Sequence, residues 1–405
     1  MTDAARPDAD EGDGPGDALA VWLLAVGQTL GFASLLYIFG ALIVPFEAGL
    51  GWSKSALSLG PTAALIVSAV AAPFMGRLVD SGLGAELLTG GAALGGGALI
   101  VLGSVGWQPM WVAAWMLIGL AHAASLYDVC FAFLTRRLGG NARLAIIRVT
   151  LVAGFASALA FPLGAAMAAA WGWQGAVLGF AAIQLGLTAP VNWTAGARLR
   201  RRARPARLRQ DRDKGALGIA LGRPEFWLLT AIFGLCWMNH STLVTYFIPV
   251  FTDLGASPGL AVAAAATVGP SQFAGRLLLM LNETRVSAQR ATAIAVAGLT
   301  LASAALLAAG AALWLIFLFA VLQGASLGLM SILRPVLTAE VLGRRGFGAI
   351  TGVIAMAPLL AAAAAPVLGA LLLDHGGTPV FVSASLGMAA LATALAWVLR
   401  RRAAR

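Results

Sequence analysis

The stretch that decides how this chain is organised is residues 198–223, RLRRRARPARLRQDRDKGALGIALGR. It contains ten of the chain's 27 Lys and Arg residues, and almost unbroken apolar sequence lies on either side of it. A run of like charges cannot enter hydrocarbon and stays in water. The stretch therefore divides the chain into two apolar parts of similar length, residues 19–197 and 224–399.

The composition is typical of a membrane protein. The chain has 405 residues, of which 60% are hydrophobic and 11% are charged, and its mean hydropathy is +0.87. A soluble domain has about 25% charged residues. Because one membrane-spanning helix takes roughly 20 apolar residues, the sequence predicts an all-α integral membrane protein with about twelve spans.

Polar segments flank the two apolar parts. Residues 1–18 are acidic and rich in Asp, Gly and Pro, so we expect a disordered tail. They also lack the basic beginning of a signal peptide. We interpret residues 198–223 as a basic linker and residues 400–405 as a basic tail, and we expect both in the cytoplasm.

Gly, Pro and charged residues divide the apolar parts into twelve predicted helices, six in each part. The predicted helices are about 19–46, 54–79, 86–105, 109–136, 144–170 and 174–197, then 224–251, 258–281, 290–310, 313–338, 347–373 and 378–399. With this count and a cytoplasmic N-terminus, the basic loops face the cytoplasm and the outer loops receive Lys54 alone. The sequence thus predicts a multi-pass inner-membrane protein with both termini in the cytoplasm. This one-sided charge also explains the net charge of +10 and argues against nucleic-acid binding.

The two parts repeat each other at a shift of 204 residues. Prolines, glycines and serines that end or kink helices coincide: Pro45 with Pro249, Ser53 with Ser257, Gly139 with Gly343, and Pro162 with Pro366. We therefore expect two six-helix bundles related by a pseudo-two-fold axis along the membrane normal. Transporters with such parallel repeats bind solute between the halves.

With six plus six helices, a basic central segment and this repeat, residues 19–399 resemble the major facilitator superfamily. The segment Gly76-Arg77-Leu78-Val79-Asp80-Ser81-Gly82 is similar to a cytoplasmic motif of that family, with Gly76 and Asp80 at the matching positions and Ser81 where the motif has a basic residue. The resemblance implies a secondary transporter in which Asp80 pairs with a neighbouring helix end and takes part in gating.

Two ionisable residues lie deep within predicted spans, Asp128 and Arg334. Facing lipid would cost either one roughly 2.5–3.5 kcal/mol, so both should face the protein interior. The guanidinium of Arg334 suits a carboxylate or phosphate, and Asp128 is the candidate proton carrier. The alternative is an Asp128–Arg334 salt bridge that only holds the two halves together.

Further polar residues are candidates for contact with a solute. Asn239, His240 and Tyr246 lie on one predicted helix and Tyr37 on another, although packing roles explain them equally well. Arg276 resembles the arginine that monocarboxylate and oxalate carriers of the superfamily place on their anionic substrate. Its alternative is an arginine that snorkels to the interface.

We expect a monomeric secondary transporter that moves a small organic anion across the bilayer by alternating access, with protons as the candidate coupling ion. The alternative is proton-coupled efflux of hydrophobic or cationic drug-like compounds, in which Asp128 binds the cation. The sequence contains no Gly-Lys-Ser/Thr nucleotide loop, no Ser-His-Asp set and no metal-ligand spacing. We therefore expect no enzyme activity, no cofactor and no metal.

Overall fold

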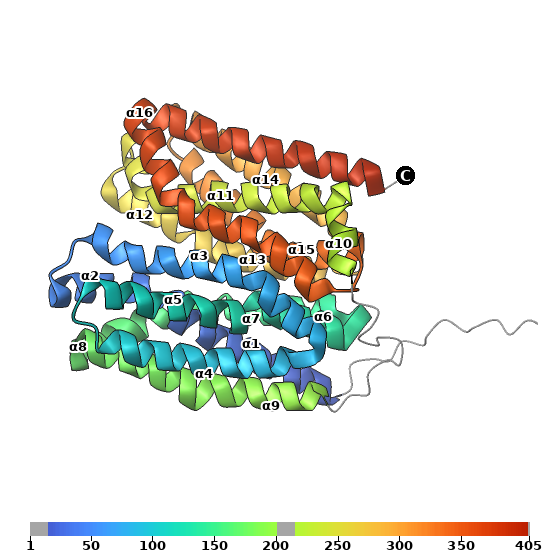
Figure 1. The fold of residues 1–405 in the computed structure, drawn as a ribbon. Coiled ribbons are helices and arrows are strands. Elements are labelled where there is room, and N and C mark those ends of the chain that lie inside the picture. The colour runs from blue at the N-terminus through green and yellow to red at the C-terminus, as the bar shows by residue number, and fades with distance from the viewer. Residues whose placement is uncertain (1–14, 201–214, 404–405) are drawn as a thin grey trace, which may run out of the picture.

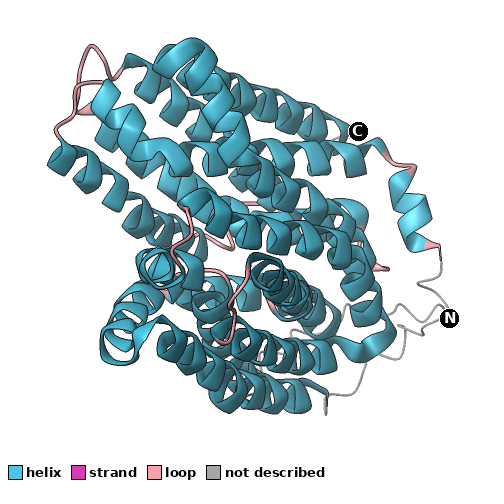
Figure 2. Ribbon diagram, turned by 60° about the vertical axis from the view of Figure 1, so that its left-hand side comes forward, coloured by secondary structure: helices cyan, strands magenta, loops and turns pink. Residues whose placement is uncertain are grey.

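The computed structural model describes residues 15–200 and 215–403, and within these ranges the secondary structure is helical, with no strand (Figure 2). We call residues 15–200 the first half and residues 215–403 the second half. The α-helices of the first half are α1 (Pro15–Leu35), α2 (Ile38–Leu50), α3 (Lys54–Leu78), α4 (Gly84–Gly103), α5 (Gln108–Ser125), α6 (Tyr127–Leu138), α7 (Ala142–Ala153), α8 (Ala156–Ile183) and α9 (Ala189–Arg200). Those of the second half are α10 (Ala216–Leu221), α11 (Pro224–Asp253), α12 (Pro258–Ala266), α13 (Val268–Leu281), α14 (Ala288–Ala308), α15 (Leu315–Leu342) and α16 (Phe347–Ala403).

Seven helical stretches in the described ranges are long and apolar enough to cross a membrane. Three of them, Ser55–Gly103, Gln108–Arg200 and Phe347–Arg402, greatly exceed the roughly 20 residues of one crossing. Each of the three contains a glycine at positive φ where the backbone leaves helical geometry: Gly82, Gly172 and Gly377. The chain is therefore a multi-pass membrane protein, and the count of twelve spans stays a prediction.

Two helix starts show the same local design in both halves. The Ser53 hydroxyl accepts a hydrogen bond from the Ala56 N–H at 3.2 Å, and the Ser257 hydroxyl accepts one from the Leu260 N–H at 3.4 Å. Both serines have φ −63° and ψ 153°. Such side-chain caps satisfy N–H groups that a helix start leaves unpaired. These two caps lie at equivalent positions of the 204-residue repeat.

The two halves touch through α3 and α16, which lie side by side in Figure 1. Gly76 and Gly348 meet there backbone to backbone, because a Cβ on either one would overlap the carbonyl oxygen of the other. Gly352 approaches the Ala72 carbonyl in the same way. Small residues of this kind allow membrane helices to pack closely.

The hydrophobic cores show where the halves are joined. One core cluster contains residues of both halves, among them Leu199, Ala220 and Leu399. It lies at the end of the molecule where α9 and α16 finish and α10 begins, on the right in Figure 1. We call this the joined end. Two other large clusters belong to one half each, so at the opposite end the halves have separate cores.

The helix boundaries differ from prediction in three respects. The first helix begins at Pro15, before residue 19, and α10 lies within the predicted linker. Five predicted helices are each divided into two α-helices. The one predicted at 174–197 is divided by the π-helical segment Gln184–Thr188, and the other breaks are, in chain order, Leu36-Tyr37, Leu126, Gly154-Phe155 and Thr267. The rest of the predicted tails and linker, residues 1–14, 201–214 and 404–405, lies outside the described residues.

Candidate functional site

A cavity of about 440 Å³ lies between the halves, with walls from both of them. Its polar and aromatic lining includes Tyr37, His122, Tyr127 and Asp128 from the first half, and Trp237, His240, Gln272, Arg276 and Arg334 from the second. With neutral histidines, two guanidinium groups and one carboxylate leave a net charge of +1 on these walls. We call this space the central cavity.

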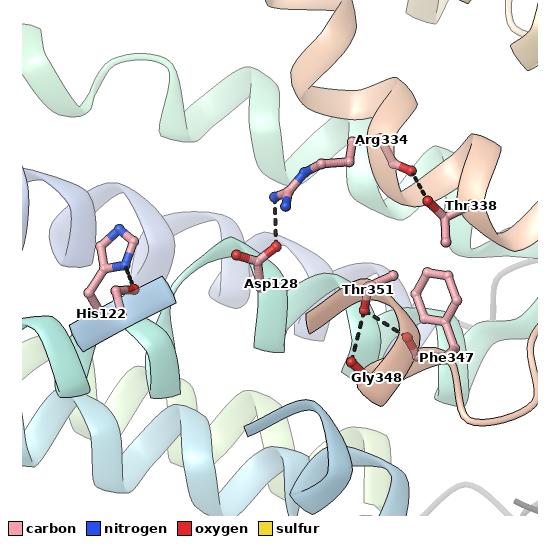
Figure 3. A network of polar contacts seen from close by, with 8 residues as sticks. His122, Asp128, Arg334, Thr338, Phe347, Gly348 and Thr351 are labelled. Atoms are coloured by element: carbon pink, nitrogen blue, oxygen red, sulfur yellow. Dashed lines mark hydrogen bonds and ion pairs between the residues drawn. The ribbon is translucent and has the colours of Figure 1, made fainter. Parts of the chain in front are cut away.

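Asp128 and Arg334 form an ion pair across the central cavity, with Nη2 of Arg334 2.6 Å from Oδ1 of Asp128 (Figure 3). The Asp128 side chain is 23% exposed and that of Arg334 12% exposed. Asp128 lies in the first turn of α6, directly after the break at Leu126. The positive end of the helix dipole there favours a carboxylate. The pair links the first half to the second.

Two further features surround the guanidinium of Arg334. Its Cζ lies 5.9 Å from the centre of a Trp237 ring, within the range of a cation–π contact. Its Nε is buried and has no hydrogen-bond partner among the described residues. The group therefore keeps donor capacity beyond its bond to Asp128.

Arg276 also reaches from the second half to the first. Its Nη1 donates to the Thr150 carbonyl at 3.3 Å and its Nη2 to Oε1 of Gln272 at 3.4 Å. Thr150 lies in the last turn of α7, and its carbonyl also accepts a hydrogen bond from the backbone N–H of Gly154 at 3.0 Å. Arg276 is only 7% exposed, so its side chain ends within the protein.

One histidine from each half lines the central cavity. Nδ1 of His122 lies 2.7 Å from the Ser68 hydroxyl. His122 is labelled at the left side of Figure 3. Nδ1 of His240 is buried without a hydrogen-bond partner among the described residues. Tyr37, at the junction of α1 and α2, lines the same space. The cavity thus offers polar groups as well as charges.

Two contacts close the joined end. The Asp80 carboxylate accepts hydrogen bonds from the backbone N–H groups of Gly348 at 2.9 Å and Ala349 at 2.8 Å, in the first turn of α16. Arg143, near the start of α7, donates to the Val286 carbonyl at 2.8 Å, between α13 and α14. Under the 204-residue shift, the segment holding Asp80 corresponds to the segment holding Val286, so the two contacts are approximate repeats of each other.

The amino-acid sequence matches the family described as Major Facilitator Superfamily over residues 21–312. This chain belongs to the Major Facilitator Superfamily. It is therefore a membrane transporter and not an enzyme. A comparison with curated proteins finds no relative at the sequence level.

Solved structures of superfamily transporters share this fold. The proton:xylose symporter XylE bound to 6-bromo-6-deoxy-D-glucose is 14% identical, with a TM-score of 0.71 and coverage of 94% of this chain and 96% of that chain. The E. coli fucose:proton symporter FucP is 15% identical, with a TM-score of 0.65 and coverage of 95% and 97%. FucP in the outward conformation is 14% identical, with a TM-score of 0.65 and coverage of 95% and 99%.

Two of the predicted solute contacts of this superfamily member lie away from the central cavity. Asn239 is fully buried within the second half. Its Nδ2 donates to the Ser385 carbonyl at 2.8 Å, and its Oδ1 accepts from Gln323 at 3.0 Å. The Tyr246 hydroxyl donates to the Pro366 carbonyl at 2.7 Å. Both side chains therefore hold helices of the second half together.

The lining residues outside the sequence prediction include Tyr127, Trp237 and Gln272. Gln272 precedes Arg276 by one helical turn, and this spacing could have revealed it. Trp237 is one of twelve tryptophans and has no distinguishing sequence signal. Among the described residues, no group of three His, Cys, Asp or Glu side chains is arranged to hold a metal ion.

Proposed function

We propose that this transporter moves a small organic anion through the central cavity by alternating access, with protons as the coupling ion. The observation that carries the proposal is the Asp128–Arg334 ion pair in a cavity whose walls have a net positive charge. Arg276 supplies the second guanidinium. A planar guanidinium fork matches the two oxygens of a carboxylate.

In this mechanism the solute and Asp128 compete for Arg334. A proton on Asp128 removes its negative charge and releases the Arg334 guanidinium, which then binds the carboxylate of the solute. Arg276 binds a second oxygen, and His240 and Tyr37 offer hydrogen bonds. When the solute and the proton leave, the Asp128–Arg334 pair forms again. Arg334 is therefore paired with a carboxylate both in the resting state and in the solute-bound state, and an unpaired buried charge at this position would be costly.

Alternating access then requires the joined end to open while the opposite end closes. We place the joined end in the cytoplasm, because the basic residues at the ends of α9 and α16 lie there and positive charge is retained inside. The conformation described here would then be open to the outside.

The proposal includes twelve spans in two bundles, a monomer in the inner membrane, and kinship with monocarboxylate or oxalate carriers.

A second candidate function is efflux of hydrophobic cations in exchange for protons. Phe32, Tyr127 and Trp237 line the central cavity beside Asp128, and aromatic rings with one carboxylate suit a lipophilic cation. The two arginines repel such a ligand, so the anion is the better match.

Ligand-induced stabilisation distinguishes the two candidates. Purified protein would be heated with small carboxylates, inorganic phosphate or tetraphenylphosphonium, because a ligand that binds the folded state raises the Tm. Uptake of a stabilising carboxylate into proteoliposomes would then be measured under an imposed proton gradient. We expect Arg334→Ala to abolish uptake and Arg345→Ala, a change at an exposed position, to leave it intact. Stabilisation by the cation alone would overturn the anion proposal.

A further inference from the structure

A second pocket, of about 130 Å³, lies between the halves at the joined end. We call it the inner pocket. Its charged lining residues are Arg143 in α7, Glu340 in the last turn of α15, and Arg344 just beyond the end of α15. It shares none of these residues with the central cavity. The first half therefore contributes one guanidinium to the inner pocket and the second half contributes another.

The two arginines have unused capacity for an anion. Neither has a carboxylate oxygen within 4.0 Å among the described residues, although Glu340 lines the same pocket. Nη2 of Arg143 donates to the Val286 carbonyl, while its Nε is buried without a hydrogen-bond partner. Arg344 is exposed and extends towards the first half, where its Nη1 lies 3.7 Å from the position of a Cβ on Gly139. The three charged side chains leave a net charge of +1.

We propose that the inner pocket binds a phosphate-class oxyanion shared by Arg143 and Arg344. Guanidinium groups that approach from two sides suit a tetrahedral anion with several acceptor oxygens better than a planar carboxylate with two. One water needs about 10–15 Å³ of such space, so the pocket has room for a small polyatomic ion. The phosphate comes either from solution or from a lipid headgroup, since basic pockets between membrane helices bind anionic headgroups.

The bound anion would act as a clamp on the joined end. Arg143 and Arg344 belong to different halves, so opening of this end must separate them and break the shared contact. A ligand that binds one conformation in preference to another shifts the population towards it. Phosphate in the inner pocket therefore stabilises the conformation described here and slows opening. This inference does not depend on which solute the central cavity carries.

The test uses the purified full-length chain with inorganic phosphate as the probe. We expect phosphate, but not chloride at equal ionic strength, to raise the Tm of the wild type. The shift should disappear in Arg344→Gln and in Arg143→Gln/Arg344→Gln. Arg344 makes no hydrogen bond within the described chain, so its single variant keeps the fold. Arg345→Gln is the matched control, because Arg345 is also exposed but does not line the pocket.

A second arm separates the two sources of phosphate and the two pockets. The Tm would also be measured in phosphatidylcholine nanodiscs with and without phosphatidylglycerol. A shift with inorganic phosphate supports an ion from solution, and a shift with phosphatidylglycerol alone supports a lipid headgroup, provided that Arg344→Gln removes it. Absence of both shifts overturns the proposal. So does a shift that survives in Arg143→Gln/Arg344→Gln but disappears in Arg334→Gln, because the anion then occupies the central cavity.

Discussion

Arg334 contacts Asp128 at 2.6 Å although the two residues lie 206 positions apart in the chain. The pair joins α15 of the second half to α6 of the first, and it forms one wall of the central cavity. Solvent reaches part of both side chains. A proton can therefore reach Asp128, and an anionic solute can reach Arg334 and replace Asp128 as its partner.

Replacement of Asp128 by Asn should uncouple transport from the proton gradient. The neutral amide cannot take up a proton, so solute exchange should continue while an imposed pH gradient no longer drives accumulation. Loss of a charged hydrogen bond should also lower the free energy of unfolding by about 1.5–3 kcal/mol. Proteoliposome uptake at several external pH values measures the first effect and denaturant titration the second.

The double variant Asp128→Asn/Arg334→Gln controls for an unpaired charge. Removal of both charges should recover part of the stability lost in the single variant, and the difference gives the coupling energy of the pair. If Asp128→Asn retained the pH dependence of the wild type, Asp128 would not be the coupling residue.

Replacement of Gly76 by Ala should loosen the joined end. Its Cβ would overlap the Gly348 backbone, and overpacking of this kind costs about 1–3 kcal/mol. Thr338 is buried beside the Asp128–Arg334 pair, so a cysteine at this position is shielded from a thiol reagent while the joined end is closed. A Thr338→Cys reporter should therefore react faster in the Gly76→Ala background, where the joined end is looser. The native Cys130 and Cys236 are buried and should contribute little.

Gly97→Ala is the control for this experiment. Gly97 lies within α4 and has no atom within 4 Å of an added Cβ, so the reporter should react at its original rate. Equal reaction rates in the two glycine variants would contradict a tight α3–α16 contact.

The serine caps provide a test of the repeat. Ser53→Ala and Ser257→Ala should each lower the free energy of unfolding by about 1 kcal/mol, because the two caps have the same geometry. The sites share no partner, so the effects should add. Ser104→Ala should have little effect, since the Ser104 hydroxyl donates to the Val101 carbonyl near a helix end and caps no N–H group. A large difference between the two caps would argue against equivalent roles.

Asn239→Ala should destabilise the protein without weakening solute binding. It leaves the Ser385 carbonyl and the Gln323 amide without their partner in a buried site, at a cost of about 1–3 kcal/mol. Ser241→Ala on the same helix is the comparison, because Ser241 lines the central cavity and should affect KM more than stability. A raised KM in Asn239→Ala at unchanged Tm would restore Asn239 as a solute contact.

Much of the fold could be predicted from the sequence, because Pro, Gly and Ser at helix ends act locally. The helix predicted at 224–251 is observed at Pro224–Asp253, and the repeated caps follow from Ser53 and Ser257. The break at Leu126 could not be predicted. It leaves the Ser125 carbonyl without a helical partner, and Gln28 of α1 donates to that carbonyl at 2.8 Å. This compensation comes from 97 positions away and has no local signal.

The sequence predicts for only some of the polar side chains whether they face the central cavity. Asp128 and Arg334 could be placed towards the interior because lipid excludes charge. Asn239 could not be distinguished from a residue that lines the cavity. A membrane helix is apolar on all sides, so a helical-wheel projection of its sequence does not show which side faces a water-filled cavity. The neighbouring His240 lines the central cavity, whereas Asn239 bonds to other helices of its own half.

The separation of charge between the halves has a consequence for biogenesis. During synthesis the first half enters the bilayer carrying the carboxylate of Asp128, and the guanidinium that neutralises it arrives only with α15. Two polypeptides made separately, one for each half, would each bear an uncompensated ion and should survive quality control only when produced together.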